Sequence, residues 1–216
     1  MPIDIFRISG LAGTGLAILA ILFSTLPYRG KQGEKFSLLN HFISELGEVG
    51  VSAAARVFNY GLLLGGLLLI PFIIKLGVVL HSVLGWLGAA AGVIAALSVS
   101  AVGIFPMNNL QAHGTAAMTY FRSGLAMVFF FGLSIHFQPS GHLAILPSAN
   151  WLSLAAFLAY AAFLLRMTPK KPKDDPGEAP DPNGEPERPR VWLLAILEWL
   201  VFFATIFWLF GMTFFI

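Results

Sequence analysis

Cysteine is absent from the 216 residues, so the fold can contain neither disulfides nor thiolate metal sites. Charged residues are also scarce, at 11% of the chain, whereas an ordinary soluble domain carries about 25%. The net charge of +2 is too small to indicate a nucleic-acid partner. In contrast, 57% of the residues are hydrophobic, a composition that needs lipid as its solvent. The sequence therefore predicts an integral membrane protein.

Long apolar runs define the expected fold class. A membrane-spanning helix needs about 20 predominantly apolar residues. Six stretches meet this requirement: 8–26, 54–75, 79–104, 114–137, 143–166 and 191–213. The fifth is the weakest, because Pro147 and Asn150 interrupt its beginning, and we expect its helix to begin nearer Trp151. The prediction is an all-α, polytopic integral membrane protein with a bundle of six transmembrane helices.

A charged segment separates the last predicted helix from the others. Residues 168–190 are rich in Pro, Gly, Lys, Asp and Glu and contain no aromatic side chain. Such a segment cannot bury enough apolar surface to offset the entropy lost on ordering. We therefore divide the chain into a five-helix membrane core (1–166), a disordered charged linker (167–190) and a sixth transmembrane helix (191–216).

Lysine and arginine are distributed unevenly between the two predicted ends. Six spans place both termini on one side, which carries only Arg7 and Lys75. The opposite side carries the other basic residues that flank the spans: Arg29, Lys31, Lys35, Arg56, Arg166, Lys170, Lys171, Lys173, Arg188 and Arg190. The side rich in Lys and Arg normally faces the cytoplasm. We expect a multi-pass protein of the cell membrane with both termini outside and the 5–6 linker in the cytoplasm.

Two polar clusters interrupt the apolar pattern on the predicted cytoplasmic side. The first is Asn40-His41-Phe42-Ile43-Ser44-Glu45-Leu46-Gly47-Glu48, and the second is Asn108-Asn109-Leu110-Gln111-Ala112-His113. If residues 38–48 are helical, His41 and Glu45 lie four residues apart on one polar face. The plain interpretation is a short amphipathic helix in the membrane interface. The sharper interpretation is a site at which the two clusters converge.

Two kinds of function fit these clusters. His41, Glu45 and His113 could hold Zn²⁺ or another divalent ion and leave a coordination position for water. That metal would lower the pKa of its water in a membrane-embedded lipid hydrolase, for which the candidate catalytic residues are Ser44, Glu45 and Glu48.

Alternatively, the clusters bind a membrane lipid, a membrane protein partner or a second copy of the chain without catalysis. We favour this binding role, because the metal-ligand set is incomplete and Ser44 lacks the Gly-x-Ser-x-Gly context of a nucleophile elbow. The candidate binding residues are Asn40, His41, Ser44, Asn59, Asn108 and His113.

Two charged residues lie inside predicted spans. Arg122 is nine residues beyond His113, and Glu198 is seven residues beyond Val191, so they lie at similar depths, about 13 and 10 Å along their helices. Because an intramembrane charge usually has a partner, we predict an ion pair between Arg122 and Glu198, with Glu45 as the competing partner. A structural role is favoured for this pair, and a small transporter is the remaining functional alternative.

The order of the motifs resembles a known family. After the cluster that ends at Gly47 come Phe58-Asn59-Tyr60-Gly61-Leu62, then Gly103-Ile104-Phe105-Pro106, and His113 seven residues after the proline. This order is similar to the uncharacterised membrane family called domain of unknown function nine-nine-eight, and more distantly to DRAM-like membrane proteins, over roughly residues 8–165. The resemblance implies a six-helix bundle and no established reaction. The positions that match the family pattern are Ser44, Gly47, Asn59, Pro106 and His113.

Overall fold

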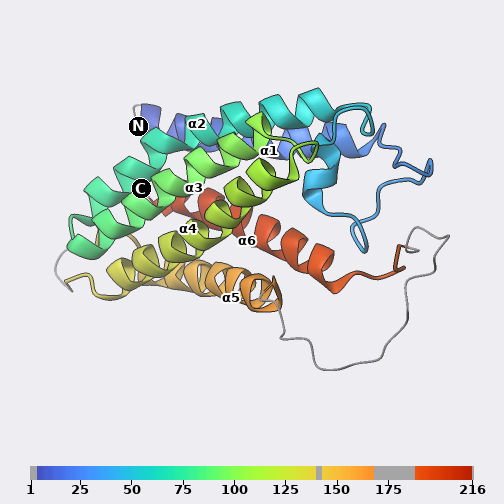
Figure 1. The fold of residues 1–216 in the computed structure, drawn as a ribbon. Helices are drawn as coiled ribbons and strands as arrows, with labels where there is room; N and C mark the ends of the chain where they lie inside the picture. Colours follow the sequence, from blue (N-terminus) through green and yellow to red (C-terminus); the bar gives the residue numbers. More distant parts are fainter. Residues whose placement is uncertain (1–3, 140–142, 168–187, 216) are drawn as a thin grey trace, which may run out of the picture.

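The structure is a computed structural model that describes residues 4–139, 143–167 and 188–215. In these residues, six long helices form a bundle (Figure 1). They are α1 (Ile5–Thr25), α2 (Ala55–Leu80), α3 (Val83–Ile104), α4 (Leu110–His136), α5 (Asn150–Met167) and α6 (Leu193–Phe215). Two short 3₁₀ helices are also present, η1 (Ile43–Gly47) and η2 (Pro147–Ala149). All six long helices are apolar enough to cross a membrane, which confirms the predicted fold class.

The helix boundaries follow the predicted spans with two informative differences. Helix α2 continues past residue 75, where the prediction ended it, and stops at His81, whose backbone is left-handed (φ 42°). Helix α5 begins at Asn150, close to the expected Trp151, after the single turn η2. Pro147 occupies the start of that turn, where a backbone N–H would have no partner within the helix, so its absence costs nothing.

The helices form a ring in chain order, in which each helix packs against the next and α6 returns to α1. Glycines set the closest approaches. A Cβ atom on Gly13 of α1 would lie 2.8 Å from the carbonyl oxygen of Gly65 on α2. The neighbouring Gly66 faces Ala96 and Ser100 of α3, also without room for a side chain. The contact between α1 and α6 is less extensive than those between the other neighbouring helices.

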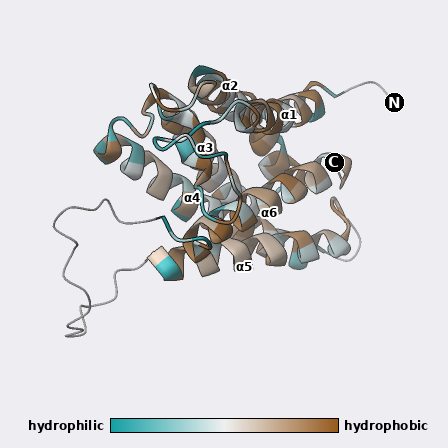
Figure 2. Ribbon diagram, turned by 90° about the vertical axis from the view of Figure 1, so that its right-hand side faces the viewer, coloured by the Kyte–Doolittle hydropathy of each residue, from teal (hydrophilic) through white to brown (hydrophobic). Residues whose placement is uncertain are grey.

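Both termini lie at one end of the bundle, and the predicted polar clusters lie at the other (Figure 1). Hydrophilic residues are concentrated in the connections and near helix ends, while the helices are mainly hydrophobic (Figure 2). Members of the two clusters lie close together, since Ser44 and His113 line one cavity. Asn108 also accepts a hydrogen bond from the N–H of Val49, the residue after the first cluster, and donates one to its carbonyl oxygen, both at 2.9 Å. The predicted disorder of the linker concerns residues 168–187, which lie outside the described ranges.

The connection between α1 and α2, residues 26–54, covers this polar end, and we call it the cap. Its 3₁₀ helix η1 packs against α1, α2 and α6. The prediction of an α-helix over 38–48 is wrong, since only Ile43–Gly47 is helical and Phe42 is extended. Three residues per turn place Ile43 and Leu46 on one side, and both are buried. His41 therefore lies outside the helix and shares no helical face with Glu45.

Candidate functional site

Glu45 and Arg188 join the cap to the chain that enters α6. The guanidinium donates two hydrogen bonds to the carboxylate, Nη1 to Oε1 at 3.0 Å and Nη2 to Oε2 at 2.7 Å. Nη1 also donates to the carbonyl oxygen of Asn40 at 2.8 Å. The Glu45 side chain is 9% exposed and that of Arg188 32%. These bonds to Glu45 raise the pKa of the Arg188 guanidinium above its ordinary value. Glu45 is thus engaged in a bidentate ion pair that closes the cap.

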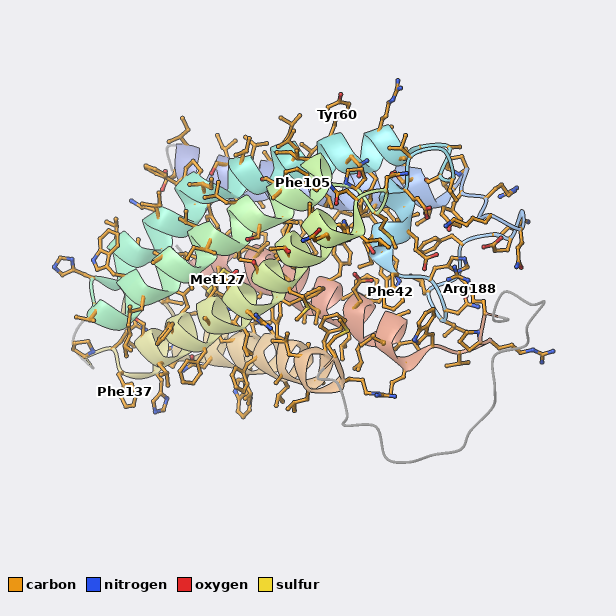
Figure 3. All side chains as sticks on the ribbon, in the orientation of Figure 1. Phe42, Tyr60, Phe105, Met127, Phe137 and Arg188 are labelled. Carbon is orange, nitrogen blue, oxygen red and sulfur yellow. The ribbon has the colours of Figure 1, made fainter. Side chains whose placement is uncertain are left out.

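Backbone and ring contacts extend this junction. The Trp192 N–H donates to the Leu39 carbonyl oxygen at 2.7 Å, and the Trp199 indole N–H donates to the His41 carbonyl oxygen at 3.1 Å. The rings of Phe42 and Trp192 meet edge to face, with centroids 4.9 Å apart. Figure 3 shows Phe42 and Arg188 together at this end of the molecule. The cap is therefore seated on the first turns of α6.

His41 is enclosed by aromatic rings beneath the cap surface. It is 1% exposed, and its ring centroid lies 5.4 Å from that of Tyr28 and 5.1 Å from that of Phe36. Nδ1 accepts the Ser37 N–H at 3.2 Å. Nε2 lies 3.7 Å from the Glu34 carboxylate, beyond hydrogen-bond distance. His41 thus belongs to the packing of the cap.

His113, in the first turn of α4, faces a cavity inside the bundle. Its Nδ1 lies 2.9 Å from the carbonyl oxygen of Phe105. Because a carbonyl oxygen can only accept, Nδ1 carries the proton and Nε2 of the neutral imidazole keeps a lone pair. The cavity measures about 80 Å³ and is also lined by Ser44 of the cap, Tyr120 of α4 and Glu198 of α6.

A second cavity of about 80 Å³ adjoins the first, and both are lined by Leu62, Val99, Tyr120 and Phe202. We call the two together the axial cavity, because all six helices contribute to its lining. Its deeper part contains a hydrogen-bonded chain in which Thr205 donates to the Tyr160 hydroxyl at 2.9 Å, and Tyr160 donates to the Tyr120 hydroxyl at 3.2 Å. The remaining lining of the deeper part is mainly aliphatic.

The predicted metal site is not assembled. Within residues 4–139, 143–167 and 188–215, no group of three His, Asp or Glu side chains is arranged to hold an ion. His41 is packed among rings, Glu45 binds Arg188, and His113 lines the cavity. The three residues therefore do not fit a divalent metal.

The predicted ion pair of Arg122 with Glu198 is also not formed among the described residues. Oε2 of Glu198 accepts the Ile43 N–H at 2.7 Å, whereas Arg122 is exposed on the outside of α4. Depth along a helix does not fix direction, because each residue turns the chain by about 100°. Arg122 follows Phe121, which lines the cavity, and so points away from it.

The remaining predicted residues hold the cap in place. Glu48 forms an ion pair with Lys31 at 2.9 Å on the cap surface, so it is not among the cavity residues. Three predicted binding residues donate their amide N–H groups to backbone carbonyl oxygens: Asn40 to Pro189, Asn59 to Gly47 and Asn108 to Val49. Of the six predicted binding residues, only Ser44 and His113 line the axial cavity.

Sequence reasoning missed Tyr120 and Arg188. A signal for Tyr120 was present, since His113, Ala117 and Tyr120 follow the i, i+4, i+7 spacing of one helix face, and all three line the cavity. No local pattern pointed to Arg188, which lies 143 residues from its partner Glu45.

A ring of six apolar helices around an axial cavity defines a multi-pass membrane protein. The chain belongs to the family described as Protein of unknown function (DUF998), which it matches over residues 11–214. The match confirms the resemblance and extends beyond residue 165 to include α6. Comparison with curated proteins and with solved structures finds no match.

Proposed function

We propose that this protein binds a single-chain amphiphile of the membrane, with the chain in the axial cavity and the polar group next to the cap. The supporting observation is the polarity of the cavity. Ser44, His113 and Glu198 gather at its cap end, while the deeper part is lined mainly by aliphatic and aromatic side chains. A mostly apolar pocket with a few converging polar groups is the usual form of a small-molecule site.

The size of the cavity favours one narrow chain. Each part measures about 80 Å³, which is smaller than an apolar cavity of about 150 Å³ that binds benzene. A ligand of any length therefore requires the helices to move apart, and a single chain requires less movement than a ring system or a two-chain lipid. The contact between α1 and α6 is the least extensive in the ring, and both helices line both parts of the cavity. This seam is the entry route that we propose.

Lipid analysis of the purified protein tests the proposal. Ala117 lines the cap-end cavity, so Ala117→Leu fills it, whereas Ala90 on α3 is exposed and Ala90→Leu serves as the matched control. We expect mass spectrometry to find a retained single-chain lipid in the wild type and in Ala90→Leu but not in Ala117→Leu. Equal retention in all three proteins, or retention in none, contradicts the proposal.

Acyl transfer is the second candidate, because Ser44, His113 and Glu198 line one cavity. Binding is the better-supported role: among the described residues no hydrogen bond joins Ser44 to His113, and Nδ1 of that imidazole engages a carbonyl oxygen, where a triad would place a carboxylate. A fluorophosphonate probe distinguishes the two roles. Labelling of the wild type that disappears in Ser44→Ala would support acyl transfer, and an unlabelled wild type would remove it.

We also infer that the cap faces the cytoplasm. The described basic residues near the cap end include Arg29, Lys35 and Arg56, whereas Arg7 and Lys75 lie toward the opposite end. Because the chain has no cysteine, single cysteines report orientation without background.

Gln32→Cys in the cap and Phe137→Cys at the opposite end both lie at exposed positions. In intact cells, an impermeant maleimide should label Phe137→Cys alone. Labelling of Gln32→Cys alone would reverse the orientation.

A further inference from the structure

We propose that the polar group of the bound amphiphile is a protonated amine, held by Glu198 within a set of aromatic side chains at the cap end of the axial cavity. This assignment rests on the proposed binding function and adds the charge of the ligand. Three observations support it: the hydrogen bonding of Glu198, the aromatic rings that line the same cavity, and the other polar groups of that lining.

Glu198 presents its carboxyl group to the cavity with only part of its hydrogen-bonding capacity used. Oε2 accepts the Ile43 N–H at 2.7 Å. In the part of the chain that the structure describes, no donor lies at Oε1 and no Lys, Arg or His lies within ion-pair distance of the carboxylate. Burial disfavours the ionised form of a carboxyl group unless a cation lies beside it, and an intramembrane charge usually has such a partner. A cationic ligand would supply that partner.

Other acidic side chains of the cap do have basic partners, so basic side chains are not scarce at this end. Glu45 binds Arg188, and Glu48 binds Lys31. Arg122 is exposed and points outward from α4. Among the described acidic side chains of this end, Glu198 is therefore the one with no basic group within ion-pair distance.

Aromatic side chains surround the same space. The cap-end cavity is lined by Phe58 of α2, Tyr120 and Phe121 of α4, and Phe202 of α6. The face of an aromatic ring attracts a cation within about 6 Å, and sets of aromatic rings are a recurrent way of binding ammonium groups. The rings also exclude water, which strengthens the attraction between the carboxylate and a cation.

The other polar groups of the lining accept hydrogen bonds. Nε2 of His113 has a free lone pair when the imidazole is neutral, and the hydroxyl oxygens of Ser44 and Tyr120 can accept. An alkylammonium group offers up to three N–H donors to such a site. A carboxylate or phosphate head group would instead lie beside Glu198, in a described lining that contains no Lys or Arg.

A matched series of ligands tests the charge of the head group. The full-length protein in uncharged maltoside micelles at pH 7 is mixed with tetradecylamine, tetradecanol or tetradecanoic acid, and bound copies are counted by native mass spectrometry. We expect the amine to bind about 10- to 100-fold more tightly than the alcohol, the factor of one charge-assisted hydrogen bond. The acid should bind least.

Two variants locate the effect. Glu198→Gln keeps an oxygen that accepts the Ile43 N–H but loses the charge, so the preference for the amine should disappear. Asp4→Asn removes one negative charge at the far end of α1, where asparagine also caps a helix, and should keep the full preference.

The outcomes separate the two proposals. Equal binding of amine and alcohol by the wild type, or a preference that survives in Glu198→Gln, overturns the amine assignment and leaves chain binding in place. Failure of all three ligands to bind overturns the proposed function as well. If Glu198→Gln cannot be purified in folded form, the ligand series on the wild type decides alone.

Discussion

Breaking the ion pair between Glu45 and Arg188 should open the cap without unfolding the bundle. Arg188→Gln removes both hydrogen bonds to the carboxylate, at 2.7 and 3.0 Å, and the bond to the Asn40 carbonyl oxygen. Glu45 would keep only the Phe42 N–H, which it accepts at 2.8 Å. The helices do not depend on these bonds, because their own backbone hydrogen bonds and the contacts between neighbouring helices lie elsewhere.

The expected energy lies between two limits. Exposed ion pairs contribute about 0.2–1 kcal/mol, and breaking a fully buried pair costs about 3–5 kcal/mol. The Glu45 side chain is buried and the Arg188 side chain is about one-third exposed, and their geometry is bidentate. We therefore expect a coupling of about 1–2 kcal/mol, which is an increase of roughly 5- to 30-fold in the opening equilibrium of the cap.

Hydrogen–deuterium exchange measures this opening locally. The informative amides are those of Phe42, Ile43 and Trp192, which are hydrogen-bonded in the closed cap. The single variants Glu45→Gln and Arg188→Gln and the double variant complete a cycle that isolates the coupling. Arg190→Ala is the matched control, since its side chain is exposed and forms no ion pair within the described ranges. Unchanged exchange in Arg188→Gln, or a coupling below about 0.5 kcal/mol, would refute the reasoning.

Three further predictions concern the same end of the molecule. Gly47→Ala should lower stability by about 1–3 kcal/mol in thermal unfolding, because its Cβ would collide with Asn59, whereas Gly114→Ala, with open space around it, should not. Burial raises the pKa of Glu34, but backbone N–H groups and His41 lower it by more, to below its ordinary value. The ionised Glu34 side chain therefore stabilises the folded cap above about pH 4.3, and this stabilisation is lost as the pH falls further. Hydrogen exchange in the cap should become faster over this pH range, and the change should be smaller in Glu34→Gln. Asn108→Ala removes two exposed hydrogen bonds to the cap and should speed exchange there by about tenfold, and unchanged exchange would contradict this role.

Hydropathy was sufficient to predict the six helices, because the thickness of a bilayer requires about 20 apolar residues in each span. The end of the second helix was predicted too early. The prediction ended the second span at Lys75, yet α2 continues beyond it. The ammonium of Lys75 lies 5.3 Å from the centroid of the Phe6 ring, and its aliphatic stem can lie along apolar surface. One lysine near a helix end is therefore a poor marker of the end.

The conformation of the cap could not be predicted from spacing within it. An i, i+4 pairing of His41 with Glu45 assumes that a helix satisfies its own backbone groups. In the structure, groups distant in sequence do so instead: Glu198 accepts the Ile43 N–H, and Asn59 donates to the Gly47 carbonyl oxygen. These partners hold a segment of five 3₁₀ residues that has little helical stability of its own.

Polar groups at matching depth were predicted to pair, and this reasoning failed for a geometric reason. Depth gives one coordinate of a side chain, and the rotation of its helix gives another. Glu198 shares the inward face of α6 with Phe202 and Thr205, four and seven residues on. Arg122 has no such relation to the inward face of α4, which carries His113 and Tyr120. Helical periodicity, applied to both charges, would have placed Glu198 on the inward face of its helix and Arg122 on the outward face.

Helix α6 completes the cap and the cavity, although a charged segment separates it from the other helices in sequence. Glu198 provides the carboxylate of the cavity, and Trp199 binds the cap backbone through its indole N–H. Arg188, just before the helix, holds Glu45. A chain ending after α5 would leave the buried Glu45 without its cation and the cavity without the wall that α6 contributes. The family match that continues through residue 214 is consistent with this dependence, because the site needs residues on both sides of the charged segment.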